Sequence, residues 1–120
     1  SILGKIPYAN ISFLKNSNLK IGDGRIVSNK NAIIKLVAHY LINEKNKKNL
    51  PINDVCRFHL GNGAIIDDIA INANVSEVGF NRSFGVMVNY LYELKNIEKN
   101  HEDYINNKKI ILSDKLKKII

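Results

Sequence analysis

Apolar residues recur at helical spacing between Asn31 and about Lys45, which predicts a helix there. Ser28 or Asn29 is suited to cap its start, and Pro51 cannot continue it. The residues of this apolar stripe are Ile33, Ile34, Val37, Ala38, Tyr40 and Leu41. His39 lies inside the helix, where a surface or packing role is expected.

From Val55 to Leu60 the pattern changes to alternation, which predicts a strand. Phe58 and Leu60 would then face the core, while Arg57 and His59 would face a polar surface or cleft. The glycine-rich residues 61–63 predict a tight turn, and a second strand is expected over residues 64–72. The two strands would form an antiparallel hairpin with His59 close to its bend.

Further along, Ser76 is suited to cap a short helix that ends near Phe84, before Gly85. The segment Val86–Leu94 fits both strand and helix periods, and its β-branched and aromatic residues favour a strand. Ile97–Tyr104 is expected to be helical or a loop. Near the N-terminus, the three residues 22–24, Gly-Asp-Gly, are a turn signal.

The last predicted helix begins after Ser113, which is suited to cap it. Its apolar residues Leu116, Ile119 and Ile120 would share one face. At 120 residues, 45% of them hydrophobic, the chain is expected to form one domain or a piece of one, and helices beside an antiparallel hairpin correspond to the α+β class. Because the chain begins at Ser1 without Met, we expect it to be partial.

Charge and composition limit the classes of function. The net charge of +7 comes from scattered lysines without interleaved aromatic residues, so we expect no nucleic-acid binding. A basic surface instead favours an anionic ligand such as a phosphate-bearing coenzyme. No apolar run approaches the roughly 20 residues that span a bilayer, and no signal peptide is recognisable, so no membrane partner is expected.

Several kinds of site can be set aside. Cys56 is the single cysteine, which excludes a disulfide within the chain and predicts a buried, inert thiol. Asp67 and Asp68 would face opposite sides of a strand, which argues against metal chelation. The run His101, Glu102, Asp103 is expected to be a solvated surface. No phosphate-binding loop or local hydrolase motif is present.

His59 is the residue best suited to proton transfer, since imidazole titrates near neutral pH. Local pattern alone favours an ordinary hydrogen-bonded histidine over a catalyst. The wider sequence adds to this: the block Phe58–Ala64 (FHLGNGA) and the later blocks Met87–Leu94 and Ile97–Tyr104 resemble the C-terminal part of malonyl-CoA decarboxylases. Agreement extends to Ser76, Gly79, Ser83 and, upstream, Ala38, His39, Tyr40, Leu41, Glu44, Lys45, Pro51 and Val55.

This resemblance covers roughly Ile33 to Tyr104 and carries specific implications. It implies part of a GNAT-type acetyltransferase-like fold and a reaction that converts malonyl-CoA to acetyl-CoA and carbon dioxide without metal or organic cofactor. It places His59 as the proton donor, Tyr92 as a supporting active-site residue and Asn62 at the substrate. No metal ligand is implied.

The resemblance also implies what lies outside the chain. Residues 1–120 would form the C-terminal portion of the catalytic domain, without the N-terminal helical domain and the first part of the catalytic domain. A homo-oligomer through that N-terminal region is implied, as is a cytoplasmic location, or the mitochondrial matrix in a eukaryote. The family pairs its histidine with a serine in a Ser-Pro-Ile-Pro-Gly-like segment, which this chain lacks.

Two further departures leave alternatives open. Ile71 and Asn74 stand where the family pattern carries Trp and Asp. A non-catalytic remnant that binds CoA or a partner chain is one alternative, and an acyl-CoA acyltransferase on the same fold is another. Nucleic-acid binding by the basic surface ranks behind both.

Overall fold

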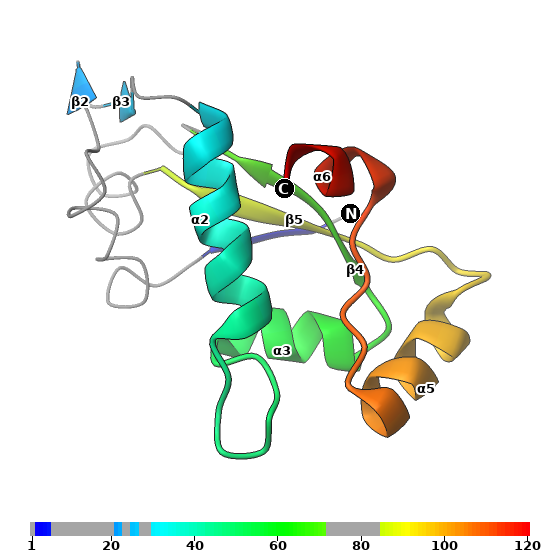
Figure 1. The fold of residues 1–120 in the computed structure, drawn as a ribbon. Helices are drawn as coiled ribbons and strands as arrows, with labels where there is room; N and C mark the ends of the chain where they lie inside the picture. The colour runs from blue at the N-terminus through cyan, green and yellow to red at the C-terminus, as the bar shows by residue number, and fades with distance from the viewer. Residues whose placement is uncertain (1, 6–20, 23–24, 27–29, 72–84) are drawn as a thin grey trace.

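The structure is a computed structural model that describes residues 2–5, 21–22, 25–26, 30–71 and 85–120. It has an α+β architecture in which helices pack around a small antiparallel sheet (Figure 1). The strands are β1 (Ile2–Lys5), β2 (Ile21–Gly22), β3 (Arg25–Ile26), β4 (Ile65–Ala70) and β5 (Met87–Leu91). The helices are α2 (Lys30–Asn43), α3 (Asp54–Gly61), α5 (Ile97–Asn107) and α6 (Asp114–Ile119).

The main sheet has the order β1-β5-β4, with β5 in the centre and antiparallel to both neighbours. The outer edge of β4 is covered by the segment that precedes α6. There the amide of Ile66 donates to the carbonyl of Ile111 at 2.9 Å, and the amide of Ser113 donates to the carbonyl of Ile66 at 3.0 Å. The chain end therefore completes the hydrogen bonding of a strand nearly 50 residues earlier.

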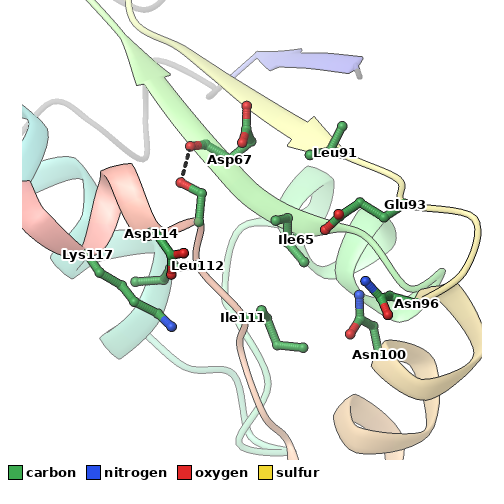
Figure 2. A pocket seen from close by; sticks show the side chains of 11 residues that line it. Ile65, Asp67, Leu91, Glu93, Asn96, Asn100, Ile111, Leu112, Asp114 and Lys117 are labelled. Carbon is green, nitrogen blue, oxygen red and sulfur yellow. Dashed lines mark hydrogen bonds between the residues drawn. The ribbon is translucent and has the colours of Figure 1, made fainter.

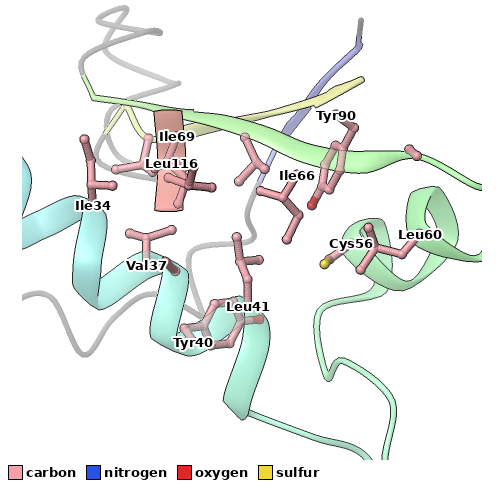
Figure 3. Packing of buried hydrophobic residues seen from close by; sticks show 14 of the residues in the cluster. Ile34, Val37, Tyr40, Leu41, Cys56, Leu60, Ile66, Ile69, Tyr90 and Leu116 are labelled. Carbon is pink, nitrogen blue, oxygen red and sulfur yellow. The ribbon is translucent and has the colours of Figure 1, made fainter. Parts of the chain in front are cut away.

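The core lies between the sheet and α2, as Figure 3 shows. The expected helix over 31–45 is confirmed, and all six residues of its apolar stripe are buried. They cluster with buried side chains from β4, from β5 and from Val86 just before it, and from α3 and α6; these are Ile66, Ile69, Val86, Val88, Tyr90, Cys56, Leu60 and Leu116. His39 is exposed on this helix, as expected, where its Nδ1 is hydrogen bonded to the Asn43 amide.

The strand predicted over Val55–Leu60 is wrong, because these residues form the helix α3. Asn53 caps the helix: its side-chain oxygen accepts a hydrogen bond from the Cys56 amide at 2.8 Å. Cys56 and Leu60 are four residues apart and both buried, while Phe58 is 64% exposed. Six residues of alternation also fit a short helix whose buried side falls on i and i+4, here Cys56 and Leu60.

With α3 a helix, the expected hairpin across residues 61–63 does not form. The second strand exists as β4, but it pairs with β5 and not with the preceding segment. The strand expected within Val86–Leu94 is confirmed as β5, and α5 extends the helical alternative for residues 97–104 as far as Asn107. The helix expected between Ser76 and Phe84 lies outside the described residues.

The final helix is confirmed as α6. The Ser113 hydroxyl accepts a hydrogen bond from the Leu116 amide at 3.2 Å, as its capping role requires. Leu116 is buried, Ile119 is partly buried and Ile120 is exposed, so the apolar face is narrower than expected. At the other end, β2 and β3 flank the turn signal, while Asp23, Gly24 and the caps proposed at Ser28 or Asn29 lie outside the described residues.

Across the described part of the chain, none of the helices combines the length and the apolar character needed to cross a membrane.

Candidate functional site

His59 sits in the last turn of α3, where the helix meets the sheet. It is buried, with 8% of its surface exposed, because Leu60 and Cys56 anchor the same face of α3 in the core. The expected placement on a strand beside an open cleft is therefore corrected to a largely covered position on a helix.

The structure brings His59 and Tyr92 together although 33 residues separate them. Nδ1 of His59 lies 2.6 Å from the Tyr92 hydroxyl, a short hydrogen bond in which either group can donate. The two rings meet edge to face, with centroids 5.8 Å apart. Tyr92 follows directly after β5, so the central strand of the sheet supplies one partner and α3 supplies the other.

Two more aromatic side chains enclose the imidazole. The Tyr90 ring stacks on it with centroids 4.6 Å apart and an interplanar angle of 26°, and the Phe58 ring lies edge-on at 5.2 Å. Tyr90 is fully buried and points from the sheet toward Cys56 on α3 (Figure 3). The imidazole therefore packs on the buried Tyr90 ring, with the exposed Phe58 ring at its edge.

Sequence reasoning did not assign Tyr90 to the site. The signal was nevertheless present, because Tyr90 and Tyr92 are two residues apart within the predicted strand Val86–Leu94 and would project to the same side. The sequence did not indicate that residues 54–61 form the helix α3, which brings His59 against that side of the two tyrosines.

Burial shifts the pKa of both hydrogen-bonded side chains, His59 and Tyr92. Burial lowers the pKa of His59 and raises the pKa of Tyr92, because a low-dielectric environment disfavours the charged form of each. Both groups are thereby biased toward their neutral forms. Burial also raises the pKa of Cys56 to about 11, with a hydrogen bond to Tyr90 opposing this rise. The expectation that this thiol is buried is confirmed.

Asn62, the third residue named by the sequence, adjoins His59 at the end of α3. Its side chain is exposed, and its Nδ2 donates to the Phe58 carbonyl at 3.0 Å. Its backbone amide donates to the His59 carbonyl at 3.1 Å. Asn62 therefore closes the helix that carries His59, and its side-chain amide is already engaged there.

Asp67 and Asp68 do not face opposite sides of β4, so that expectation is corrected. A shift of register between Ile66 and Asp68 interrupts the alternation. As a result Nζ of Lys115 lies 3.3 Å from Asp67 and 3.8 Å from Asp68. Within the described residues no group of three or more histidine, cysteine, aspartate or glutamate side chains is placed to hold a metal ion.

A cavity of about 370 Å³ opens beside β4, between the strand, α5 and the segment before α6 (Figure 2). Its polar lining includes Asp67, Glu93, Asn100, Asp114 and Lys117, and His59 is not among its lining residues. The Ser113 hydroxyl closes one side by donating to the Asp67 carbonyl at 2.5 Å. This cavity is therefore separate from the aromatic enclosure of His59.

Of the two departures from the family pattern, Ile71 is partly buried and packs against the core. Asn74, like Ser76, Gly79 and Ser83, lies outside the described residues.

Comparisons of this chain with a family model and with curated proteins point to the same family. Residues 5–120 match the family model described as the malonyl-CoA decarboxylase C-terminal domain. The mitochondrial malonyl-CoA decarboxylase of Rattus norvegicus is 35% identical over 88 residues, which cover 73% of this chain and 18% of that protein. The protein of the same name from Anser anser anser is 36% identical over 84 residues, which cover 70% of this chain and 16% of that protein.

Solved structures of malonyl-CoA decarboxylases also match the fold of this chain. The malonyl-CoA decarboxylase of Rhodopseudomonas palustris superposes with a TM-score of 0.70 at 38% identity, over 75% of this chain and 21% of that one. The enzyme of Cupriavidus metallidurans gives 0.69 at 25% identity, over 93% of this chain and 31% of that one.

The chain thus spans less than a fifth of the length of these curated relatives. Its match to the family model nevertheless extends over nearly all of its own length. The family resemblance drawn from the sequence is confirmed, and this chain belongs to the malonyl-CoA decarboxylase C-terminal domain family.

Proposed function

We propose that this chain is the C-terminal portion of the catalytic domain of a malonyl-CoA decarboxylase, and that His59 is its proton donor. The observation that carries the proposal is the 2.6 Å hydrogen bond between Nδ1 of His59 and the Tyr92 hydroxyl. The sequence resemblance named these two residues separately, and the fold pairs them. An oriented imidazole beside a neutral phenol suits general acid catalysis.

The reaction requires one carbon–carbon bond to break and one carbon–hydrogen bond to form. The bond between the malonyl carboxylate and the α-carbon breaks, carbon dioxide leaves, and the electron pair passes into the thioester enolate. The α-carbon then takes a proton from His59, and this proton remains in the acetyl group. A second proton from solvent later restores the protonated imidazole. Positioned acid catalysis of this kind contributes about 10²–10⁴-fold.

Tyr92 determines which proton is transferred. Because Nδ1 is engaged by the tyrosine, the proton that reaches carbon comes from Nε2. In the protonated ring Nδ1–H donates to the Tyr92 oxygen, and it continues to do so after Nε2 has lost its proton. Burial lowers the pKa of His59, so the imidazolium is the less populated form of the ring near neutral pH but the stronger acid toward the enolate.

The remaining parts of the site belong to the proposed longer polypeptide. A serine from the upstream part of the catalytic domain would stabilise the enolate oxygen beside His59. The N-terminal helical domain and the first part of the catalytic domain would complete a GNAT-type fold and provide the homo-oligomeric interface. The α+β architecture and the antiparallel sheet are compatible with this fold.

The proposal makes Asn62 a substrate contact through its exposed position beside the histidine turn. No metal or organic cofactor takes part in it. The enzyme would act in fatty acid metabolism as a lyase, in the cytoplasm or, in a eukaryote, in the mitochondrial matrix.

The test joins this chain to its natural upstream sequence and follows acetyl-CoA formation from malonyl-CoA. We expect His59→Gln to lower kcat by about 10²–10⁴-fold, and Tyr92→Phe to lower it less because the imidazole remains. His39→Gln, at an exposed histidine of α2, is the matched control and should leave turnover unchanged. Unchanged turnover in His59→Gln would remove His59 from the mechanism.

Two other outcomes identify the alternatives. Transfer of the acyl group to an acceptor without release of carbon dioxide would indicate an acyltransferase. Binding of CoA measured by calorimetry, with no turnover by the unmodified protein, would indicate a non-catalytic remnant. The departures at Ile71 and Asn74 are the observation that favours this second alternative.

A further inference from the structure

The turn that follows His59 is held by one face of α5, in which Ile97, Asn100, His101 and Tyr104 all reach residues 61–63. Nδ1 of His101 lies 2.6 Å from the Gly61 carbonyl oxygen. Nδ2 of Asn100 donates to the Gly63 carbonyl at 3.1 Å. These four residues are spaced at i, i+3, i+4 and i+7, so they form a single stripe on the helix.

The backbone of the turn is in close contact with the same stripe. Gly63 has a φ of +91°, and a Cβ built on it would lie 2.4 Å from the Ile97 carbonyl oxygen. A Cβ on Gly61 would lie 3.8 Å from a ring carbon of Tyr104, which is ordinary packing distance. Because Gly63 has no side chain, the backbone that follows α3 can lie this close to α5.

The acceptor in each of these two hydrogen bonds is a backbone carbonyl oxygen, which determines which atom carries the proton. A carbonyl oxygen can only accept, so Nδ1 of His101 must carry a proton. Carbonyl groups at the C-terminal end of a helix lack hydrogen-bond partners within the helix. Here the His101 side chain of α5 donates to one of them, the Gly61 carbonyl. Nothing in the polar run around His101 indicates this hydrogen bond, because the partner, Gly61, lies 40 residues away.

The connection also reaches Tyr92. Only Glu93, Leu94, Lys95 and Asn96 separate Tyr92 from the first residue of α5, and the Asn96 amide donates to the Glu93 carbonyl at 2.8 Å, which closes the turn. The helix α5 is therefore joined to Tyr92 by the chain and to the His59 turn by side-chain hydrogen bonds.

We infer that Asn100 and His101 are positioning residues that hold the end of α3 so that His59 meets Tyr92. The inference rests on the proposed role of His59. Misplacement of a catalytic group by about 1 Å can cost about 10²-fold in rate. Loss of either hydrogen bond should therefore lower kcat while leaving KM for malonyl-CoA nearly unchanged, since neither residue is assigned a contact with substrate.

The experiment uses the full-length polypeptide and four variants of α5. His101→Leu removes the donor, whereas His101→Asn restores an N–H close to the position of Nδ1. Asn100→Asp replaces a donor by an acceptor facing the Gly63 carbonyl. Glu102→Gln changes an exposed residue of the same helix and is the matched control.

We expect kcat to fall about 10- to 100-fold in His101→Leu and in Asn100→Asp, and to recover in His101→Asn. The pKa of the His59 imidazole, followed by NMR, should rise in the two impaired variants as its ring becomes more exposed. Equal kcat in His101→Leu and Glu102→Gln would overturn the inference. The inference would also be overturned if the loss of kcat in the impaired variants equalled the fraction of protein that is unfolded in each sample.

His59→Gln, measured in parallel, separates this inference from the proposed function. If His59→Gln abolishes turnover and the α5 variants do not impair it, the catalytic proposal stands and the positioning role fails. If His59→Gln retains turnover, the proposed function fails, and the NMR measurement still reports whether α5 orients the ring.

Discussion

At the scale of single residues, the imidazole of His59 combines burial with a polar partner. Its ring is enclosed by Tyr90, Tyr92 and Phe58, and its Nδ1 is bonded to the Tyr92 hydroxyl. Enclosure favours the neutral ring, and the hydrogen bond satisfies one of its nitrogens. The neutral ring can therefore pack against its aromatic neighbours while one of its nitrogens keeps a hydrogen-bond partner.

This burial predicts a dependence of stability on pH. The folded pKa of His59 lies below the unfolded value of about 6.5. The unfolded chain therefore binds a proton more readily, so stability is unaffected well above pH 6.5 and falls as the pH drops below it. For one proton the slope cannot exceed about 1.4 kcal/mol per pH unit.

The measurement is urea unfolding of the chain at a series of pH values between 8 and 5. In His59→Gln the titrating group is absent, so the decline toward pH 5 should be smaller than in the unmodified chain. The exposed His39, changed to Gln, serves as control and should leave the decline in place. Parallel curves for the unmodified chain and His59→Gln would contradict the prediction.

At the scale of elements, the decisive feature is the junction between α3 and β4. The helix begins at the Asn53 cap and ends at Gly61, and its last turn contacts α5. The sequence correctly indicated a break at residues 61–63, since glycine and asparagine are turn formers there. It could not indicate that the break joins a helix to a strand, because six alternating residues satisfy both periods.

The two glycines of this junction should respond differently to alanine. Gly63 needs a positive φ and has no room for a Cβ, so Gly63→Ala should cost about 2 kcal/mol or more in unfolding free energy. Gly61 closes a helix and meets only ordinary packing, so Gly61→Ala should be neutral or stabilise by up to about 1 kcal/mol. Denaturant unfolding of both variants checks the pair, and equal effects would refute the close approach of Ile97.

At the scale of the whole molecule, elements far apart in sequence complete one another. Segment 111–113 covers the edge of β4, and α6 then places Leu116 in the core, with none of its surface exposed. The core is therefore closed by the last ten residues of the chain. A helix this short is stable only through such packing.

Leu116→Ala should therefore cost about 2–5 kcal/mol, the range for a fully buried leucine. Ile120, predicted from the sequence to share its face, is 44% exposed, and Ile120→Ala should change stability by less than about 0.5 kcal/mol. Thermal and urea unfolding distinguish the two outcomes. Similar losses in both variants would mean that α6 packs in a different orientation.

The sequence by itself determined the helix α2, the strands β4 and β5, the capped helix α6 and the family. Each of these follows from local periodicity, a capping residue or a run of family-specific residues, all of which are properties of neighbouring positions. It also named His59 and Tyr92 one by one.

Only the tertiary structure decided that these two side chains meet, that Tyr90 stacks on the imidazole and that α5 holds the turn behind it. It also decided that Val55–Leu60 is helical and that β4 pairs with β5. The physical reason is the same in each case. Partners 17 to 40 residues apart are selected by which surfaces can be buried together, and no local pattern records that choice.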